Sequence, residues 1–135
     1  MPDLVVTVPF RDVDLHGHLH NATHLAYAEA AITAHLAARG MAQVIDPKGP
    51  VIFAVKAASV VFHAPTGFGD VLHLAVRILR IGTTSLGFQV DLTGAGGDLR
   101  ARADVTWVAL DAGHRRPVPL PDRLRQGLAS DHSPG

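Results

Sequence analysis

The feature that most limits the fold of this chain is the shortness of the turns in its second half. Strand-like segments at 51–63, 71–81, 84–93 and 99–107 follow one another with only short connections between them. Parallel strands need a crossover of a dozen or more residues, whereas antiparallel strands can be joined by a tight turn. These segments therefore predict an antiparallel meander.

Two of the segments also alternate as strands with one buried face do. Segment 84–93 alternates apolar residues with polar or small ones, and its apolar set is Leu86, Phe88, Val90 and Leu92. Segment 99–107 places Trp107 on its apolar face, with Arg100 and Arg102 on the other. Because successive side chains of a strand point to opposite faces, we expect Trp107 in the core and both arginines on a solvated face, with contact to a CoA phosphate or a carrier protein as the alternative for the arginines.

A single long helix is predicted ahead of the meander. Residues 21–40 are rich in alanine, and their larger apolar residues recur at helical spacing. We expect Asn21 or Thr23 to cap its start and Gly40 to follow its end. With a strand expected at 4–10, the order is strand, helix and four strands. This order predicts an α+β domain with a five-stranded antiparallel sheet and one helix.

The composition indicates one globular domain. The chain has 135 residues, 47% of them apolar and 18% charged, and its formal net charge is zero. A neutral chain has no general attraction for nucleic acid or membrane surfaces, and no apolar run is long enough to span a bilayer. The absence of cysteine excludes disulfides and cysteine-based sites. We expect a cytoplasmic protein without a signal peptide, one domain over 1–128 and a disordered tail over 129–135.

The most unusual stretch runs from Arg11 to Asn21, between the first strand and the helix. It holds Asp12, Asp14 and three of the nine histidines. Burying so many ionisable groups without partners would be costly, so we do not expect this stretch to lie in the hydrophobic core. The start of a helix directs free N–H groups outward and favours negative charge that develops there. A carboxylate beside such a helix start suits acyl-transfer chemistry.

Hydrolysis of a thioester needs a nucleophile or base and a stabiliser for the tetrahedral oxyanion. Asp14 could supply the first. The backbone N–H groups of Asn21, Ala22 and Thr23 could supply the second, and His18 could orient the carboxylate or the attacking water. The chain has no GxSxG sequence, so a serine triad has no support.

The motif Asp-x-Asp-x-x-Gly-His-x-x-Asn at residues 12–21, followed by a long helix and a meander, resembles the hotdog-fold thioesterases. It is most similar to the 4-hydroxybenzoyl-CoA thioesterase-like group and the related acyl-ACP thioesterases. Gly69-Asp70-Val71-Leu72 is a weaker second match. The resemblance implies a hotdog fold, in which a curved sheet surrounds a central helix. It also implies hydrolysis of an acyl-CoA or acyl-carrier thioester without a cofactor or metal.

The resemblance further implies roles for single residues. The catalytic carboxylate of the family falls on Asp14, and two site positions of the acyl-ACP branch fall on His16 and His18. Glu29, the only glutamate of the chain, matches an acidic helical position and is a possible second acid. The sequence departs from the family at 82–84, where one branch carries basic residues for the nucleotide part of CoA.

Other interpretations of the same residues stay open. Asp12 and Asp14 could be turn carboxylates that accept backbone N–H groups and pair with Arg11. His16, His18 and His20 would share one face of an extended segment and could bind a metal with His24 nearby, although we expect none. The chain could also be a non-catalytic acyl-binding hotdog domain, or a hotdog dehydratase, which the motif argues against.

The predicted strands carry apolar residues on more than one face, which a single helix cannot cover. In segment 51–63 both alternating sets contain valine and phenylalanine or isoleucine. Exposed apolar strands promote aggregation unless they are covered. We therefore expect a homodimer or a dimer of dimers, as the resemblance also implies. On this view Ser59 and His63 would line the pocket of the partner subunit.

Overall fold

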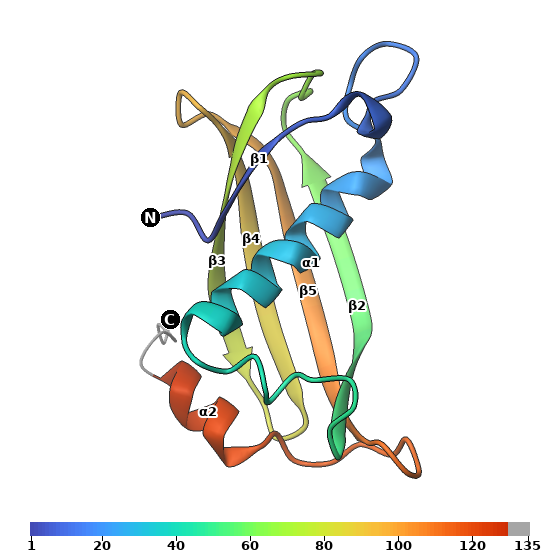
Figure 1. Ribbon diagram of the computed structural model, residues 1–135, viewed down its shortest axis with the longest axis vertical. Coiled ribbons are helices and arrows are strands. Elements are labelled where there is room, and N and C mark those ends of the chain that lie inside the picture. The colour runs from blue at the N-terminus through green and yellow to red at the C-terminus, as the bar shows by residue number, and fades with distance from the viewer. Residues whose placement is uncertain (130–135) are drawn as a thin grey trace.

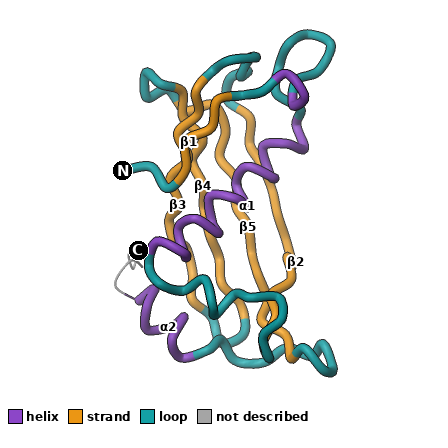
Figure 2. Tube along the Cα trace, viewed as in Figure 1, coloured by secondary structure: helices purple, strands orange, loops and turns teal. Residues whose placement is uncertain are grey.

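The computed structural model describes residues 1–129 and confirms the α+β architecture (Figures 1 and 2). Its elements, in chain order, are β1 (Leu4–Thr7), a 3-10 turn (Phe10–Asp12), α1 (Asn21–Ala38), β2 (Val51–Phe62), β3 (Val71–Ile81), β4 (Ser85–Gly94), β5 (Leu99–Asp111) and α2 (Asp122–Ala129). Of the predicted tail 129–135, Ala129 ends α2 and the rest lies outside the described residues. No helix within residues 1–129 is long and apolar enough to cross a bilayer.

The five strands form one sheet in the order β1-β3-β4-β5-β2, with β1 and β2 at its edges. Every pair of neighbouring strands is antiparallel, as the short turns predict. The sheet curves around α1, which crosses one face diagonally (Figure 1). This arrangement is the predicted hotdog fold, and it brings the start of α1 close to the end of β2.

The core lies between α1 and the concave face of the sheet. The predicted inward set of β4 is fully buried, each side chain being 0% exposed: Leu86, Phe88, Val90 and Leu92. The helix contributes an equally buried set of Ala28, Ala31, Ile32 and Leu36. Burying a large apolar side chain contributes about 1.5–3 kcal/mol. Since the alanines are small, the helix backbone can lie close to the sheet.

The start of α1 differs from the prediction. The helix begins at Asn21, but its N-cap is His20, which makes no side-chain capping bond. Instead, the His20 amide donates to the Asp12 carbonyl (3.0 Å), and the His20 carbonyl accepts from the Thr23 amide (3.1 Å). The prediction of Asn21 or Thr23 as the cap is therefore wrong, because the His20 carbonyl, and no side chain, accepts the Thr23 amide.

The end of α1 is as predicted. Gly40 has a φ of +74°, a conformation that glycine adopts without strain. Its amide donates to the Ala37 carbonyl (3.0 Å), and the Met41 amide donates to the Leu36 carbonyl (3.0 Å). These two bonds form a Schellman motif, which satisfies carbonyls that the helix end leaves free.

The two edge strands differ in length and exposure. β1 ends at Thr7, earlier than predicted, and the chain turns after Pro9, which has no amide to donate. β2 is much longer, and several of its apolar side chains are half-exposed in the single chain: Val55 (52%), Val61 (58%) and Phe62 (47%). The free edge of the sheet on this side is therefore apolar.

Candidate active site

The loop before α1 is a tight turn closed by its own backbone. The Asp14 amide donates to the His18 carbonyl (2.8 Å), and the Gly17 amide donates to the Asp14 carbonyl (3.0 Å). Gly17 has a φ of +75°, a left-handed conformation that costs other residues about 1–2 kcal/mol. The glycine of the motif is therefore required by the turn that presents Asp14.

The Asp14 carboxylate is held by the same turn. Its Oδ1 accepts the backbone amides of His16 (2.9 Å) and His18 (3.1 Å). The His18 amide is the largest cause that holds the pKa of Asp14 below its ordinary value, and the His16 amide adds to it, whereas partial burial opposes both. Both bonds end on Oδ1, which leaves Oδ2 as the oxygen available for chemistry.

A second turn, residues 65–70, supports the turn that holds Asp14. His18 forms a β-bridge with Gly67, and the Leu19 amide donates to the Thr66 carbonyl (2.7 Å). This second turn is in turn fixed by Asp70, whose Oδ2 accepts the Gly67 amide (2.8 Å). The position of Asp14 therefore depends on residues about fifty positions further along the chain.

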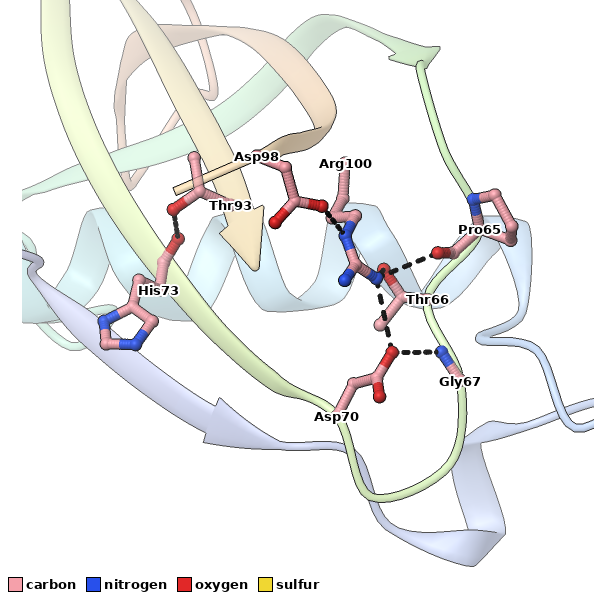
Figure 3. A network of polar contacts seen from close by, with 8 residues as sticks. All are labelled: Pro65, Thr66, Gly67, Asp70, His73, Thr93, Asp98 and Arg100. Carbon is pink, nitrogen blue, oxygen red and sulfur yellow. Dashed lines mark hydrogen bonds and ion pairs between the residues drawn. The ribbon is translucent and has the colours of Figure 1, made fainter. Parts of the chain in front are cut away.

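Arg100 ties the second turn to β5, as Figure 3 shows. Its guanidinium donates to the Pro65 carbonyl (2.9 Å), to Asp70 Oδ2 (3.2 Å) and to Asp98 Oδ2 (2.5 Å). The Arg100 side chain is only 19% exposed. The prediction of a solvated arginine is wrong for Arg100, because these acceptors draw its head group into the turn.

A cavity of about 340 Å³ opens beside Asp14. It is lined by the loop, the start of α1, the end of β2 and the second turn: Asp14, His18, Leu19, Asn21, His24, Phe62, His63, Ala64, Pro65 and Thr66. His16 contributes its amide to Asp14 but does not line the cavity. His63, expected from a partner subunit, lines the cavity of its own chain because β2 ends beside the helix start. Ser59 lies on β2 outside it.

The start of α1 borders the cavity with Asn21. The Thr23 amide is already donated to the His20 carbonyl. Of the three amides predicted to stabilise the oxyanion, those of Asn21 and Ala22 have no backbone acceptor within residues 1–129. They are the first two amides of the helix, where the helix dipole favours negative charge.

Asp12 has a different environment from Asp14. Tyr27 donates its hydroxyl to Asp12 Oδ2 (2.5 Å), and Arg11 donates to Oδ1 (3.1 Å). The Tyr27 bond is the largest cause of a lowered pKa at Asp12, while burial and the Asp12 contact raise the pKa of Tyr27. The Tyr27 bond holds Asp12 against the helix, and the Arg11 pair occupies its other oxygen, so neither oxygen of Asp12 is left free, whereas the backbone amides predicted for a turn carboxylate are accepted by Asp14.

His24 is a cavity residue that sequence reasoning did not select. It is 4% exposed, and its Nδ1 donates to the His20 carbonyl (2.9 Å). In the neutral ring this bond leaves Nε2 as an acceptor. The ring also packs edge-on against Phe62, with centroids 4.9 Å apart. The sequence does place His24 in the first helical turn after the motif, which could have marked it as a site residue. Its contact with Phe62 on β2, however, could be found only from the three-dimensional structure.

Glu29 does not share the cavity of Asp14. It lines a second and larger cavity of about 590 Å³ together with Trp107 and residues of β2 and the 39–50 connection. Burial raises the pKa of Glu29, and the Trp107 indole opposes that rise. Trp107 is 7% exposed, which confirms its predicted place in the core.

A metal site has no support in the part of the chain that the structure describes. Within residues 1–129 no group of three or more histidine, aspartate or glutamate side chains is arranged to hold a metal ion. The rings of His16 and His18 lie 6.5 Å apart, and His20 lines another surface pocket that it shares with Asp14 and Phe10. That activity needs no metal stays a prediction.

Comparison with known proteins identifies relatives over nearly the whole chain. The sequence profile of the thioesterase-like superfamily matches residues 8–128. The acyl-CoA thioester hydrolase YbgC of Escherichia coli O157:H7 is 29% identical over 119 residues, 88% of this chain and 89% of that protein. The 1,4-dihydroxy-2-naphthoyl-CoA hydrolase of Thermosynechococcus vestitus is 31% identical over 126 residues, 92% of this chain and 86% of that protein.

The fold is shared with solved structures. Slr0204, a 1,4-dihydroxy-2-naphthoyl-CoA thioesterase from Synechocystis, superposes with a TM-score of 0.87 at 23% identity, covering 96% of this chain and 97% of the other. At this identity the likeness shows the hotdog architecture, and the chemistry must be argued from the residues of the present chain.

Proposed function

Since the chain belongs to the thioesterase-like superfamily, we propose that it hydrolyses acyl-CoA thioesters at the cavity beside Asp14. The observation that carries this proposal is the Asp14 carboxylate itself. It is fixed through one oxygen by two backbone amides and lies in a cavity that the start of α1 also borders. Two relatives named as CoA thioester hydrolases support the same activity.

In the proposed reaction Asp14 acts as a nucleophile. Two amides stabilise its ionised form, which makes it a weak base but keeps it charged at neutral pH. Oδ2 attacks the thioester carbon, the C–S bond breaks, and the thiolate leaves and takes a proton from water. Water then attacks the mixed anhydride, which releases the carboxylic acid and restores the Asp14 carboxylate.

The oxyanion that forms in each step needs hydrogen-bond donors in place before the reaction. We assign this role to the first amides of α1, those of Asn21 and Ala22, with the helix dipole behind them. His18 lines the same cavity and would position the attacking water. His24, through its Nε2, is a second candidate for that task.

The relatives differ in the acyl groups that their names give, so the acyl group does not carry over from them. Acyl-carrier thioesters are the alternative substrate class. A non-catalytic acyl-binding domain is the alternative function, and the motif argues against a dehydratase.

The test is steady-state hydrolysis of a panel of acyl-CoA thioesters by the purified full chain, followed through release of the free thiol. We expect turnover of at least one member, and the same turnover after exhaustive treatment with a chelator. Binding of acyl-CoA without thiol release would instead support the non-catalytic domain. Conversion of a β-hydroxyacyl thioester to its enoyl product would support the dehydratase.

A further inference from the structure

Three histidines line the cavity beside Asp14, and the protein holds them with different firmness. His24 is buried, at 4% exposed, whereas His18 and His63 are exposed. Within residues 1–129, His24 is also the one of the three whose ring makes a hydrogen bond. Proton transfer needs a group held in one orientation and one tautomer, and His24 is the cavity histidine for which the fold sets both.

The fold determines which nitrogen of His24 carries the proton. Nδ1 lies 2.9 Å from the His20 carbonyl oxygen and 3.2 Å from the Asn21 carbonyl oxygen. Both partners can only accept, so Nδ1 donates its N–H to them, and in the neutral ring Nε2 has a lone pair. Nε2 makes no hydrogen bond within residues 1–129. His24 is therefore held in the tautomer whose second nitrogen can take up a proton.

Packing holds the same ring over the start of α1. Phe62 on β2 contacts it edge-on, with centroids 4.9 Å apart and an interplanar angle of 84°. Helical side chains lean towards the N-terminus of their helix, so His24 leans towards the amides of Asn21 and Ala22. Nε2 is not among the side-chain nitrogens that the protein seals off, so it is open to the cavity. The ring is thus fixed on one side and open at its basic nitrogen.

The second step of the proposed reaction needs a base other than Asp14. Once the Asp14 carboxylate is part of the mixed anhydride, it cannot also take a proton from the attacking water. The other titratable groups that line this cavity are His18, His24 and His63. Of these, His24 has the fixed tautomer and the open lone pair.

On the premise that Asp14 forms an acyl-enzyme, as in the proposed function, we propose that His24 is a catalytic residue, the general base of the second step. Nε2 takes one proton from the water while the water oxygen bonds to a carbonyl carbon of the anhydride. The bond from that carbon to the bridging oxygen then breaks, which leaves one carboxyl group and one carboxylate. The carboxyl group and the imidazolium each return a proton to solvent. A positioned general base contributes about 10²–10⁴-fold to a rate.

Quenched single turnovers with the best acyl-CoA of the panel separate the two steps. The thiol is released in the first step and the acid in the second, and the peptide containing Asp14 carries the acyl group between them. In His24→Gln and His24→Asn we expect thiol release within about threefold of wild type and acid release slowed roughly a hundredfold. Acylated Asp14 peptide should therefore accumulate in both variants.

The two substitutions at His24 remove different parts of the ring. Asparagine can keep a donor near the place of Nδ1 and has nothing at the place of Nε2. Glutamine can keep a polar group near Nε2 that is not basic. Near-normal thiol release in either variant shows that the site is folded. His73→Gln on β3, outside the cavity, is the control and should keep both rates within about twofold of wild type.

The wild-type protein provides a test that needs no variant. The base must be neutral, so acid release should slow as pH falls from about 8 to 5, the range in which histidine takes up a proton. Thiol release should change little, because the loop amides keep Asp14 ionised. Asp14, His18 and His63 face the same cavity, and His20 adjoins His24 at the helix start. The assignment to His24 therefore requires that His24→Gln lose this dependence on pH.

This proposal and the proposed function can fail separately. If thioesters are hydrolysed but acid release is unchanged in both His24 variants, or is constant from pH 8 to 5, His24 is not the base and the hydrolase stands. Hydrolysis without acylated Asp14 peptide in any variant would also exclude the role, since no anhydride would form. Absence of thiol release from every thioester would overturn both.

Discussion

At the scale of single residues, the two aspartates of the motif show how environment separates chemically identical groups. Asp12 has both oxygens bonded to side chains, one of them the Tyr27 hydroxyl. Asp14 has its bonds on Oδ1 and lies in the cavity. The first aspartate can hold the loop, and the second has an oxygen left to react.

We predict that Asp14→Asn lowers kcat/KM for the best thioester of the panel by roughly a hundredfold or more, because the amide cannot replace the ionised carboxylate. Its thermal unfolding midpoint should stay within a few degrees of wild type. Asp12→Asn should lose much less activity and more stability. Measured kcat/KM values and unfolding curves for both variants check this, and wild-type activity in Asp14→Asn would exclude the assignment.

The nucleophilic role of Asp14 predicts where oxygen from water goes in a single turnover. With enzyme in excess over thioester in H₂¹⁸O, attack of water at the Asp14 carbon of the anhydride should leave the label in the peptide containing Asp14, and the first acid released should then carry an unlabelled oxygen from Asp14. Mass spectrometry of product and peptide measures both. Label that enters only the acid, together with no acylated Asp14 peptide in quenched single turnovers, would show that Asp14 acts as a base.

The lowered pKa of Asp14 makes a prediction about pH. The His18 and His16 amides hold that pKa below the ordinary 3.8. A group needed in its ionised form gives full activity above its pKa, and activity is lost as pH falls through it. Values of kcat/KM should therefore show no acidic fall due to Asp14 between about pH 8 and pH 5. An acidic limb inside this range, in protein that remains folded, would be the contrary result.

At the scale of elements, the site is an assembly of turns held by a strand. Arg100 on β5 bonds to Pro65 and Asp70, and Gly67 of the same turn forms the bridge to His18. Arg102 on the same strand pairs with Asp91 on β4 instead of with either turn. The two arginines have the same side chain, but of the two it is Arg100 that bonds to the turn supporting Asp14.

We predict that Arg100→Gln lowers kcat by roughly tenfold with a smaller effect on KM, because the Asp14 turn loses its support and the reacting groups move apart. Arg102→Gln is the control and should stay within about twofold of wild type. Arg100→Lys keeps the charge without the forked donors and should recover only part of the loss. Equal losses in the Arg100 and Arg102 variants would mean that the effect is general destabilisation.

The elements could be predicted from the sequence because their signals are local. Alternation marked the buried face of β4, helical spacing marked α1, and Gly40 marked its end. The motif placed Asp14 and His18 in one loop. Contacts between distant segments left no such signal: the bond from the His20 amide to the Asp12 carbonyl, the bonds of Arg100 to the second turn, and the packing of His24 against Phe62. These depend on how β2, β5 and the loops approach in space.

At the scale of the whole molecule, both cavities lie on the side of the sheet that ends in β2, and this edge is the apolar one. β2 spans Val51–Phe62 and pairs with β5 on one side only. A long edge strand with unpaired backbone groups and half-exposed valines associates unless it is covered. Pairing of two such edges about a twofold axis would cover both copies at once.

We therefore predict that the active protein is a homodimer or a dimer of dimers, joined through β2. Light scattering should give at least twice the 14.3 kDa mass of one chain. Val61→Asp places a charge on the 58% exposed position of this strand and should shift the protein to monomer with loss of activity. Val5→Asp is the matched control, because Val5 is 52% exposed on the opposite edge strand β1 and should leave the assembly intact. A fully active species at the mass of a single chain would refute the prediction, since the apolar edge would then be stable in water without a partner.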